Sequence, residues 1–514
     1  MNRRDFISTT GLMLASSAVE LHASAKDFDP TEQPISSLQQ TLESGALSSE
    51  ALTEAYLWRI ARFDRHGPEY RSVLALNPSA IAAARGLDAE RKAGKIRGPL
   101  HGIPIIIKDN IETSDPVATT AGSFALAHSR RAADAPLVAR LRAAGAIVLG
   151  KSNLSEWANF RSTHASSGWS GMGGQTRNSY ARDRNPSGSS AGSAVASALS
   201  FCAGAIGTET NGSILSPASV NGLIGLKPTV GVVNGKGIVP ISPRQDTAGP
   251  MCRSVSDAAL LAACMADNPL GFGTRGRDIE AFRLHGIRSG VLPMPKSAHP
   301  GTARLFADAR ALFEQEGAVL LDLKPPAAFD DMDDPETQAL RYEFKAAINL
   351  YLGGLDHTQV ECRTLTDLIA YNRAHADEEL IVFGQELFEA AESKGPLTDA
   401  IYQKAVADLN RSADTEGLAA LFDQGADVLM APCNGPAELI DVVWGDRHGG
   451  GWPQIANAAA IAGYPSITVP AGLVAGLPVG IALVARRHQD GLLLQVARAF
   501  ERASNARIAP HLSI

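Results

Sequence analysis

Short apolar, β-branched runs alternate with helical segments from residue 100 onward, and this alternation constrains the fold more than any other feature of the chain. Residues 103–107 include three consecutive isoleucines, residues 135–145 have an amphipathic helical pattern that ends at a glycine, and residues 146–149 form a second apolar run. Apolar runs return in residues 426–485, whereas residues 300–425 are more helical and more charged. Strands that alternate with helices indicate an α/β fold.

The rest of the chain adds helices and shows no internal boundary. Residues 36–95 have apolar side chains at helical spacing, and Ser48 or Ser49 is suited to cap the second helix of that segment. No Pro/Ser-rich linker, charge run or internal repeat divides the chain. We therefore predict one domain over residues 26–514, with the helical part at about 300–425 as an insertion or cap.

Composition excludes several classes of protein. The net charge of −7 gives no basic footprint for nucleic acid, and no segment beyond the N-terminus has the length of apolar sequence that a membrane span needs. The histidines show no metal-ligand spacing, and the cysteines show neither a CxxC pair nor a disulfide pattern, so we expect core cysteines, no metal and no cofactor. The cysteines are Cys202, Cys252, Cys264, Cys362 and Cys433. We expect a monomer or a homodimer.

The first 25 residues have the three parts of an export signal. Arg3 and Arg4 are followed by a weakly apolar stretch at residues 11–19 and by Ala-Ser-Ala at residues 23–25, which fits a small-x-small cleavage site. The arginine pair favours the twin-arginine route. We predict a signal peptide at residues 1–25 and a periplasmic or secreted protein.

Three motifs match known patterns but lack the required context. Residues 145–152, GAIVLGKS, have the letters of a P-loop, but their middle residues are themselves the predicted strand, so nucleotide binding is rejected. Residues 188–192, GSSAG, fit a nucleophile elbow centred on Ser190, but a polar loop precedes them instead of a strand. The HGGG at residues 448–451 lies far downstream of this serine, so an α/β-hydrolase is a weak alternative.

A lysine after the isoleucine run and two serine-rich loops remain to be explained. Burial at the end of that strand would lower the pKa of Lys108 and make its neutral amine a base. Residues 185–193, NPSGSSAGS, form one small-residue loop, and a second loop follows with Ser213 at its centre. Asn211 and Gly212 tolerate a positive φ, so that loop can point backbone N–H groups at an oxyanion.

Five motifs in order make the chain resemble the amidase signature family over about residues 35–500. The resemblance implies one α/β domain around a large mixed β-sheet covered by helices on both faces. The motifs are GPLHGIPIIIKDNI (98–111), PSGSSAGSA (186–194), GTETNGSILSPASVNGLIGLKPTVG (207–231), PRQDTAGPM (243–251) and AGYPSITVPAG with GLPVGIAL (462–483).

The resemblance also implies the roles of individual residues. The family's Ser–cis-Ser–Lys triad corresponds to Ser213 as nucleophile, Ser189 after a cis peptide bond as the bridging serine, and Lys108 as base. Ser190 is expected in the supporting hydrogen-bond network. The implied oxyanion hole consists of the backbone N–H groups of Thr210, Asn211, Gly212 and Ser213.

Three positions depart from the family's usual pattern. The family commonly has Asp and Gly where this chain has Glu209 and Asn211, and Arg where it has Leu215. The Asn211 change keeps the backbone donor. Because Leu215 replaces that arginine, the sequence does not show which side chain stabilises the loop around Ser213.

Within the family, three segments are most similar to bacterial peptide amidases, which remove the C-terminal amide of a peptide to give a carboxylate and ammonia. They are GKSNLSEWANFRS (150–162), GGQTRN (173–178) and FGQELF (383–388). Trp157, Asn159 and Phe160 are candidates for the substrate pocket, with a core position as the alternative for Trp157. The remaining alternatives are an aryl- or fatty-acyl-amide hydrolase, a glutamyl-tRNA amidotransferase A-type subunit, and a non-catalytic binding protein.

Overall fold

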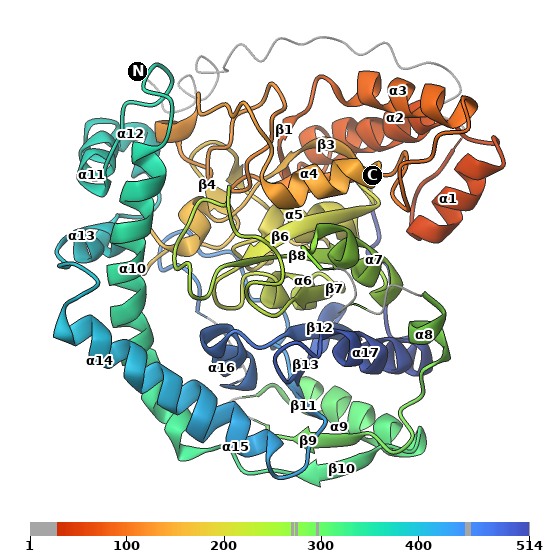
Figure 1. Ribbon diagram of the computed structural model, residues 1–514, viewed down its shortest axis with the longest axis vertical. Coiled ribbons are helices and arrows are strands. Elements are labelled where there is room, and N and C mark those ends of the chain that lie inside the picture. The colour runs from red at the N-terminus through yellow and green to blue at the C-terminus, as the bar shows by residue number, and fades with distance from the viewer. Residues whose placement is uncertain (1–27, 269–271, 273–275, 295–297, 448–453, 513–514) are drawn as a thin grey trace.

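An 11-stranded mixed sheet runs through the centre of the computed structural model, which describes residues 28–268, 272, 276–294, 298–447 and 454–512 (Figure 1). The strand order is β1-β3-β2-β6-β8-β7-β12-β13-β11-β9-β10, with both parallel and antiparallel pairs. Its strands are β1 (Val73–Leu76), β2 (Pro104–Lys108), β3 (Ile147–Ser152), β6 (Gly204–Glu209), β7 (Ile224–Lys227), β8 (Thr247–Cys252), β9 (Arg288–Val291), β10 (Val319–Asp322), β11 (Val428–Pro432), β12 (Ser466–Val474) and β13 (Leu477–Ala485). A separate hairpin pairs β4 (Trp169–Ser170) with β5 (Gly174–Gln175).

The predicted strands at residues 103–107 and 146–149 are confirmed as β2 and β3, and α4 (Pro136–Ala143) connects them as predicted. The two strands pair in parallel and are buried along their whole length, which explains their continuous apolar sequence. The Gly-Lys-Ser of the P-loop pattern, residues 150–152, lies within β3 itself. It therefore forms no phosphate-binding loop.

The N-terminal segment is mostly helical, as predicted, with α1 (Ile35–Glu43), α2 (Ser49–Arg59), η3 (Ile60–Arg65) and α3 (Ala80–Lys92). Ser48 caps α2, because its hydroxyl accepts a hydrogen bond from Ala51 N. The prediction of helix throughout residues 36–95 is wrong at Val73–Leu76, which forms β1 and pairs antiparallel with β3. A run of four apolar residues has no period that separates strand from helix, and pairing with β3 decides the outcome.

Helices cover both faces of the sheet, as the alternation of side chains along β13 shows. Ile481 and Leu483 belong to the hydrophobic cluster that contains Phe500 of α17, whereas Ala482 belongs to the cluster that contains Leu215 of α6. Successive side chains of a strand point to opposite faces, so α17 and α6 lie on opposite sides of the sheet. The helices packed around the sheet are α5 (Ala191–Ala198), α6 (Leu215–Val220), α7 (Val255–Met265), α8 (Gly276–Ala281), α9 (Pro300–Gln315), α16 (Gln454–Ala462) and α17 (Asp490–Ser504).

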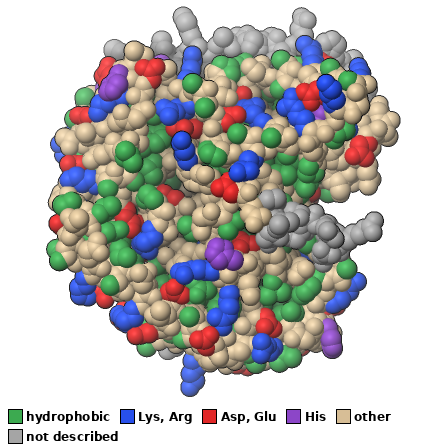
Figure 2. All heavy atoms as spheres, in the orientation of Figure 1, with side chains coloured by type: hydrophobic (Ala, Val, Ile, Leu, Met, Phe, Trp, Pro, Cys, Tyr) green, Lys and Arg blue, Asp and Glu red, His purple; other side chains and the backbone are tan. Residues whose placement is uncertain are grey.

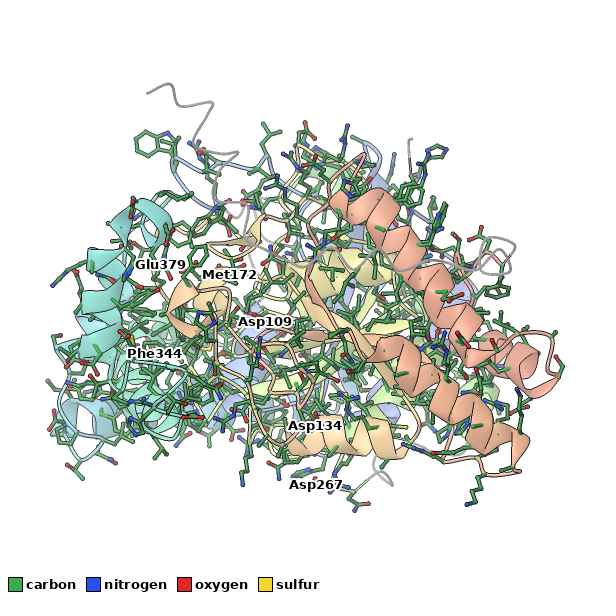
Figure 3. All side chains as sticks on the ribbon, turned by 90° about the horizontal axis from the view of Figure 1, so that it is seen from above. Asp109, Asp134, Met172, Asp267, Phe344 and Glu379 are labelled. Carbon is green, nitrogen blue, oxygen red and sulfur yellow. The ribbon has the colours of Figure 1, made fainter. Side chains whose placement is uncertain are left out.

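A run of helices between β10 and β11 stands at one side of the sheet, coloured teal to blue in Figure 1, and we call it the helical wall. It consists of η7 (Ala327–Asp331), α10 (Asp333–Gly353), α11 (Leu365–Ala374), α12 (Ala376–Glu379), α13 (Glu386–Glu392), α14 (Ala400–Leu409), η8 (Asn410–Leu418) and α15 (Ala419–Phe422). Phe344 and Phe388 of the wall share a hydrophobic cluster with Trp157 and Ile241. Figure 3 labels Phe344 and Glu379 on it. The first part of the predicted insertion, residues 300–322, instead supplies α9 and the sheet strand β10.

The face shown in Figure 2 carries acidic and basic side chains interspersed with apolar ones, without a continuous basic area. None of the helices in the described ranges has the length and hydropathy to cross a membrane. Four of the five cysteines are buried, and all five are free thiols. The predicted signal at residues 1–25 lies outside the described residues.

Candidate active site

Lys108 ends β2 with a fully buried side chain. Its Nζ donates hydrogen bonds to Ser189 Oγ at 2.7 Å and Thr208 Oγ1 at 2.8 Å, and lies 3.4 Å from Thr208 O. No salt bridge joins Lys108 to a carboxylate of the described residues. Burial lowers the pKa of the Lys108 ammonium to about 7, and the negative charges of Asp246 and Glu209 oppose this shift only in part.

Ser189 lies in the loop that leads into α5, and the Gly188–Ser189 peptide bond is cis, as the resemblance implied. The Ser189 carbonyl accepts a hydrogen bond from Ser155 N at 3.0 Å, which fixes the loop against the segment after β3. A Cβ on Gly188 would lie 2.2 Å from Ser155 Oγ, so this close approach requires glycine. Contacts with Ser155 therefore fix the position of this loop, and the Ser189 hydroxyl points toward Lys108.

Ser213 follows β6 in a turn in which Gly212 has a φ of 80°. Its side chain lines a cavity, and its carbonyl accepts from Ser190 N at 3.2 Å. The hydrogen bonds of the described residues include none between the Ser213 and Ser189 hydroxyls. The Lys108–Ser189 link is thus formed in this structure, whereas the Ser189–Ser213 link is not.

The loop before Ser213 presents backbone donors to the same cavity. The N–H groups of Asn211, Gly212 and Ser213 donate to no acceptor of the described residues, and all three residues line the cavity. The next two N–H groups, of Ile214 and Leu215, donate to Glu209 Oε2 at 2.7 and 3.0 Å. Glu209 therefore braces this loop, while Leu215 packs in an apolar cluster.

Thr208 and Asn110 are part of the site and were not predicted. Thr208 Oγ1 accepts from Lys108 Nζ and from Asn110 Nδ2, the latter at 3.0 Å. Ser190 binds the backbone of the same residue, donating to Thr208 O at 3.0 Å and accepting from Thr208 N at 3.2 Å. This is a supporting position for Ser190, not that of an exposed nucleophile. Thr208 lies near the carboxyl end of β6, beside the end of the parallel strand β2 that carries Lys108. This neighbourhood depends on the pairing of strands about 100 residues apart, which no local sequence pattern encodes.

The cavity at Ser213 has a volume of about 740 Å³ and lies between the sheet loops and the helical wall. Of the three predicted pocket residues, Asn159 and Phe160 line it. Trp157 instead packs in the core with its ring 5.7 Å from that of Phe388. The backbone here is left-handed, with φ of 50°, 55° and 69° from Trp157 to Asn159, which turns the chain so that the later residues reach the cavity while Trp157 does not.

Acidic side chains are the only charged ones among the described residues that line this cavity. They come from the start of the helical wall and from the segment after β11. They are Asp330, Asp333, Glu336, Glu438 and Asp446. The cavity therefore has a negative potential that favours groups with a positive charge.

The described part of the chain contains no group of three or more His, Cys, Asp or Glu side chains placed to hold a metal ion. The HGGG motif at residues 448–451 lies outside the described residues. Around Ser213, the described residues thus offer a serine hydroxyl, a buried amine, a second hydroxyl hydrogen-bonded to that amine, and backbone donors. These are the components of acyl transfer.

Comparisons with known proteins agree on one family. A family model described as Amidase matches residues 51–494. A probable amidase of Arabidopsis thaliana is 36% identical over 524 residues, covering 98% of this chain and 96% of that protein. The X-ray structure of the native peptide amidase from Stenotrophomonas maltophilia is 44% identical with a TM-score of 0.87, covering 94% of this chain and 99% of that chain. The glutamyl-tRNA(Gln) amidotransferase A-type subunit of Symbiobacterium thermophilum is 32% identical over 495 residues, covering 91% of this chain and 96% of that protein.

Proposed function

Because the chain belongs to the amidase family and hydrolyses the C–N bond of amides, we propose that its substrates are peptides with a C-terminal amide and that its catalytic residues are Ser213, Ser189 and Lys108. The observation that carries the catalytic assignment is the 2.7 Å hydrogen bond between Lys108 Nζ and Ser189 Oγ at the buried end of β2. A lysine with a pKa of about 7 is neutral in a large fraction of molecules at neutral pH. It can then accept a proton.

In acylation, Ser213 Oγ attacks the amide carbonyl carbon while its proton passes to Ser189 Oγ and the Ser189 proton passes to Lys108 Nζ. The carbonyl π electrons move to oxygen, and the backbone N–H groups of residues 210–213 stabilise that oxyanion. When the tetrahedral intermediate collapses, the C–N bond breaks and Lys108 returns the proton through Ser189 to the nitrogen, which leaves as ammonia. The product of this stage is an ester of Ser213.

In deacylation, water attacks the ester carbonyl, and the same relay first takes the water proton and then returns a proton to Ser213 Oγ. The products are a regenerated hydroxyl and a peptide carboxylic acid, which releases its remaining proton to solvent and becomes the carboxylate. Ser189 must form a hydrogen bond with Ser213 for either stage, so a rotation of one serine side chain has to precede proton transfer. Catalytic hydrogen bonds are often completed only in the substrate complex.

The preference for a peptide amide rests on the neighbouring peptide amidase at 44% identity and on the cavity. The leaving group of a primary amide is small, so the volume of about 740 Å³ is left for the acyl part. Polar and acidic lining residues suit a peptide better than a long alkyl chain. The resemblance to the amidotransferase A-type subunits is weaker, at 32% identity.

The test is ammonia release from a matched panel: a dipeptide amide, an aryl amide, a long-chain fatty amide and glutamine. We expect the dipeptide amide to have the highest kcat/KM. Ser213→Ala should abolish turnover, while Ser393→Ala, at an exposed serine of the helical wall, should leave it unchanged. Full turnover by Ser213→Ala would exclude the mechanism, and a preference for another amide would exclude only the substrate class.

We also propose export by the twin-arginine route, which rests on Arg3, Arg4 and the signal-like sequence of residues 1–25. Replacing both arginines by lysine should retain the protein in the cytoplasm of a bacterial host that has the pathway. Cell fractionation with an antibody to the protein measures this. Equal export of the double variant would contradict the route.

A further inference from the structure

A buried carboxylate of the helical wall contacts the loop that carries the oxyanion donors. Glu336, in the first turn of α10, is 8% exposed and has no salt-bridge partner among the described residues. Its Oε1 accepts from Asn211 Nδ2 at 2.9 Å and from Gln245 Nε2 at 2.8 Å, and its Oε2 lies 3.1 Å from Asn211 Nδ2. Both amide partners therefore orient their N–H groups toward one acidic side chain.

Gln245 transmits this contact to the backbone of the loop. Its Nε2 also donates to Thr210 O at 3.3 Å. The carbonyl of Thr210 and the N–H of Asn211 belong to one planar peptide group and point in opposite directions. Because Gln245 holds the Thr210 carbonyl on its own side, the Asn211 N–H points away from Gln245, toward the cavity that Asn211 lines.

The side chain of Asn211 is anchored as well. Its Nδ2 donates to Glu336 and also to Asn457 Oδ1 of α16, at 2.5 Å. An amide nitrogen has two hydrogens, and these two acceptors use both. Asn211 is thus fixed between α10 and α16. This also restricts the backbone of the next residue, Gly212, which has a positive φ.

We propose that Glu336 is a positioning residue for the oxyanion hole, holding the Thr210–Asn211 peptide through Gln245 and through the Asn211 side chain. This inference rests on the proposed function. Glu336 is not suited to be a base, because its carboxylate already accepts from two amide groups, and Ser189 has Lys108 as its partner. For a substrate without a positive charge, its effect should therefore fall on the transition state and leave binding of the ground state unchanged.

The experiment compares Glu336→Ala and Glu336→Gln with the wild-type enzyme on an N-acetylated dipeptide amide, which has no ammonium group for the acidic cavity lining to attract. A displaced oxyanion donor should lower kcat of Glu336→Ala by about 100-fold, toward the loss that removal of one such donor causes, with KM within about threefold. Glu336→Gln keeps one acceptor oxygen, so its kcat should fall less than that of Glu336→Ala. Asp334→Asn makes the same change of charge at an exposed position of the same helix and should leave kcat unchanged.

Inhibition by a peptide aldehyde separates positioning from a general structural role. Ser213 Oγ adds to the aldehyde carbon, its proton moves to the Ser189–Lys108 relay, and the carbonyl oxygen becomes an oxyanion in the proposed hole. The inhibition constant of the aldehyde should rise in proportion to the loss of kcat, whereas that of the product carboxylate should stay within about twofold. Active-site titration corrects for any misfolded fraction.

An unchanged kcat in either variant would overturn the proposal, and so would a loss of kcat without a matching loss of aldehyde affinity. If Glu336→Ala does not fold, Glu336→Gln decides by the same two criteria. Failure of the proposed function is separate, because wild-type enzyme would then release no ammonia from the peptide amide, or Ser213→Ala would remain active.

Discussion

Two buried lysines on neighbouring strands differ in what surrounds their amines. Lys108 Nζ is hydrogen-bonded to neutral oxygen atoms, those of Ser189 and Thr208. Lys151 Nζ lies 3.5 Å from Asp109 Oδ1, a residue that Figure 3 labels near the middle of the molecule. A nearby carboxylate stabilises the ammonium form. Burial lowers the pKa of both lysines, and Asp109 opposes this shift at Lys151 at close range, whereas Lys108 has no carboxylate within hydrogen-bond distance among the described residues.

The first prediction at the residue scale concerns pH. Lys108 must be neutral to accept a proton, so kcat/KM should rise about tenfold per pH unit below about 7 and level off above it. If Lys108 had the pKa of a free lysine, about 10.4, kcat/KM would go on rising to about pH 10. Initial rates of ammonia release from pH 5 to 10 measure the profile. A rise that continues to pH 10 would contradict a depressed pKa.

The second prediction concerns loss of the base. Lys108→Met keeps most of the buried apolar stem but has no amine, so kcat should fall by about 10²–10⁴-fold, the range for a general base. Lys236→Met, at an exposed lysine, is the control and should keep full activity. Ammonia release and thermal unfolding, measured together, distinguish loss of the base from loss of the fold. Lys108→Met with at least half the wild-type kcat would exclude Lys108 as the base.

Among the elements, the strand and loops that carry the proposed triad were predictable, because each is encoded by residues adjacent in sequence. The isoleucine run specified β2, and the small-residue loops specified the surroundings of Ser189 and Ser213. The opposite side of the cavity was not predictable in the same way. Glu336 contacts Asn211 across 125 positions of sequence, and only the packing of α10 creates that contact. Local patterns cannot encode such a pairing, and β1 was missed for the same reason.

At the scale of elements, the negative charge on both sides of the cavity predicts a preference for substrates with a positively charged group. Asp330 and Asp333, at the start of the helical wall, face the same cavity as Glu438 and Asp446 after β11. We expect a dipeptide amide with a free α-ammonium group to have a higher kcat/KM than its N-acetylated form, by about 3- to 10-fold at low ionic strength. The difference should shrink as salt screens the charges.

The Asp330→Asn/Asp333→Asn double variant should reduce the same ratio, measured by ammonia release at low ionic strength. Its control is the N-acetylated amide, whose kcat/KM should change little in the variant. A ratio near one in the wild-type enzyme would contradict an electrostatic preference.

At the scale of the whole molecule, a buried network of charged side chains connects the helical wall to the segments that follow β2 and β3. Arg161 has no exposed side-chain surface, and its Nη1 donates to Glu156 Oε1 at 2.5 Å and to the Glu379 carbonyl at 2.6 Å. Glu379 belongs to α12 of the wall, and its Oε1 accepts from Ser123 Oγ and Phe124 N, both at 2.7 Å. Burial raises the pKa of Glu156 to about 8, against the opposing effect of the arginine charge. One guanidinium therefore lies beside two buried carboxyl groups, 2.5 Å from Glu156 Oε1 and 3.6 Å from Glu379 Oε2.

Removing that guanidinium should destabilise the whole fold more than any surface ion pair could. Arg161→Leu leaves Glu156 and Glu379 buried without a cation, and breaking a buried pair in this way costs about 3–5 kcal/mol of unfolding free energy. The matched control is Arg373→Leu on the same wall, whose ion pair with Glu389 is exposed and should contribute about 0–1 kcal/mol. Urea unfolding followed by tryptophan fluorescence measures both. Similar losses in the two variants would show that the wall is held by its apolar contacts around Phe344 and Phe388, with the charge network contributing nothing beyond a surface pair.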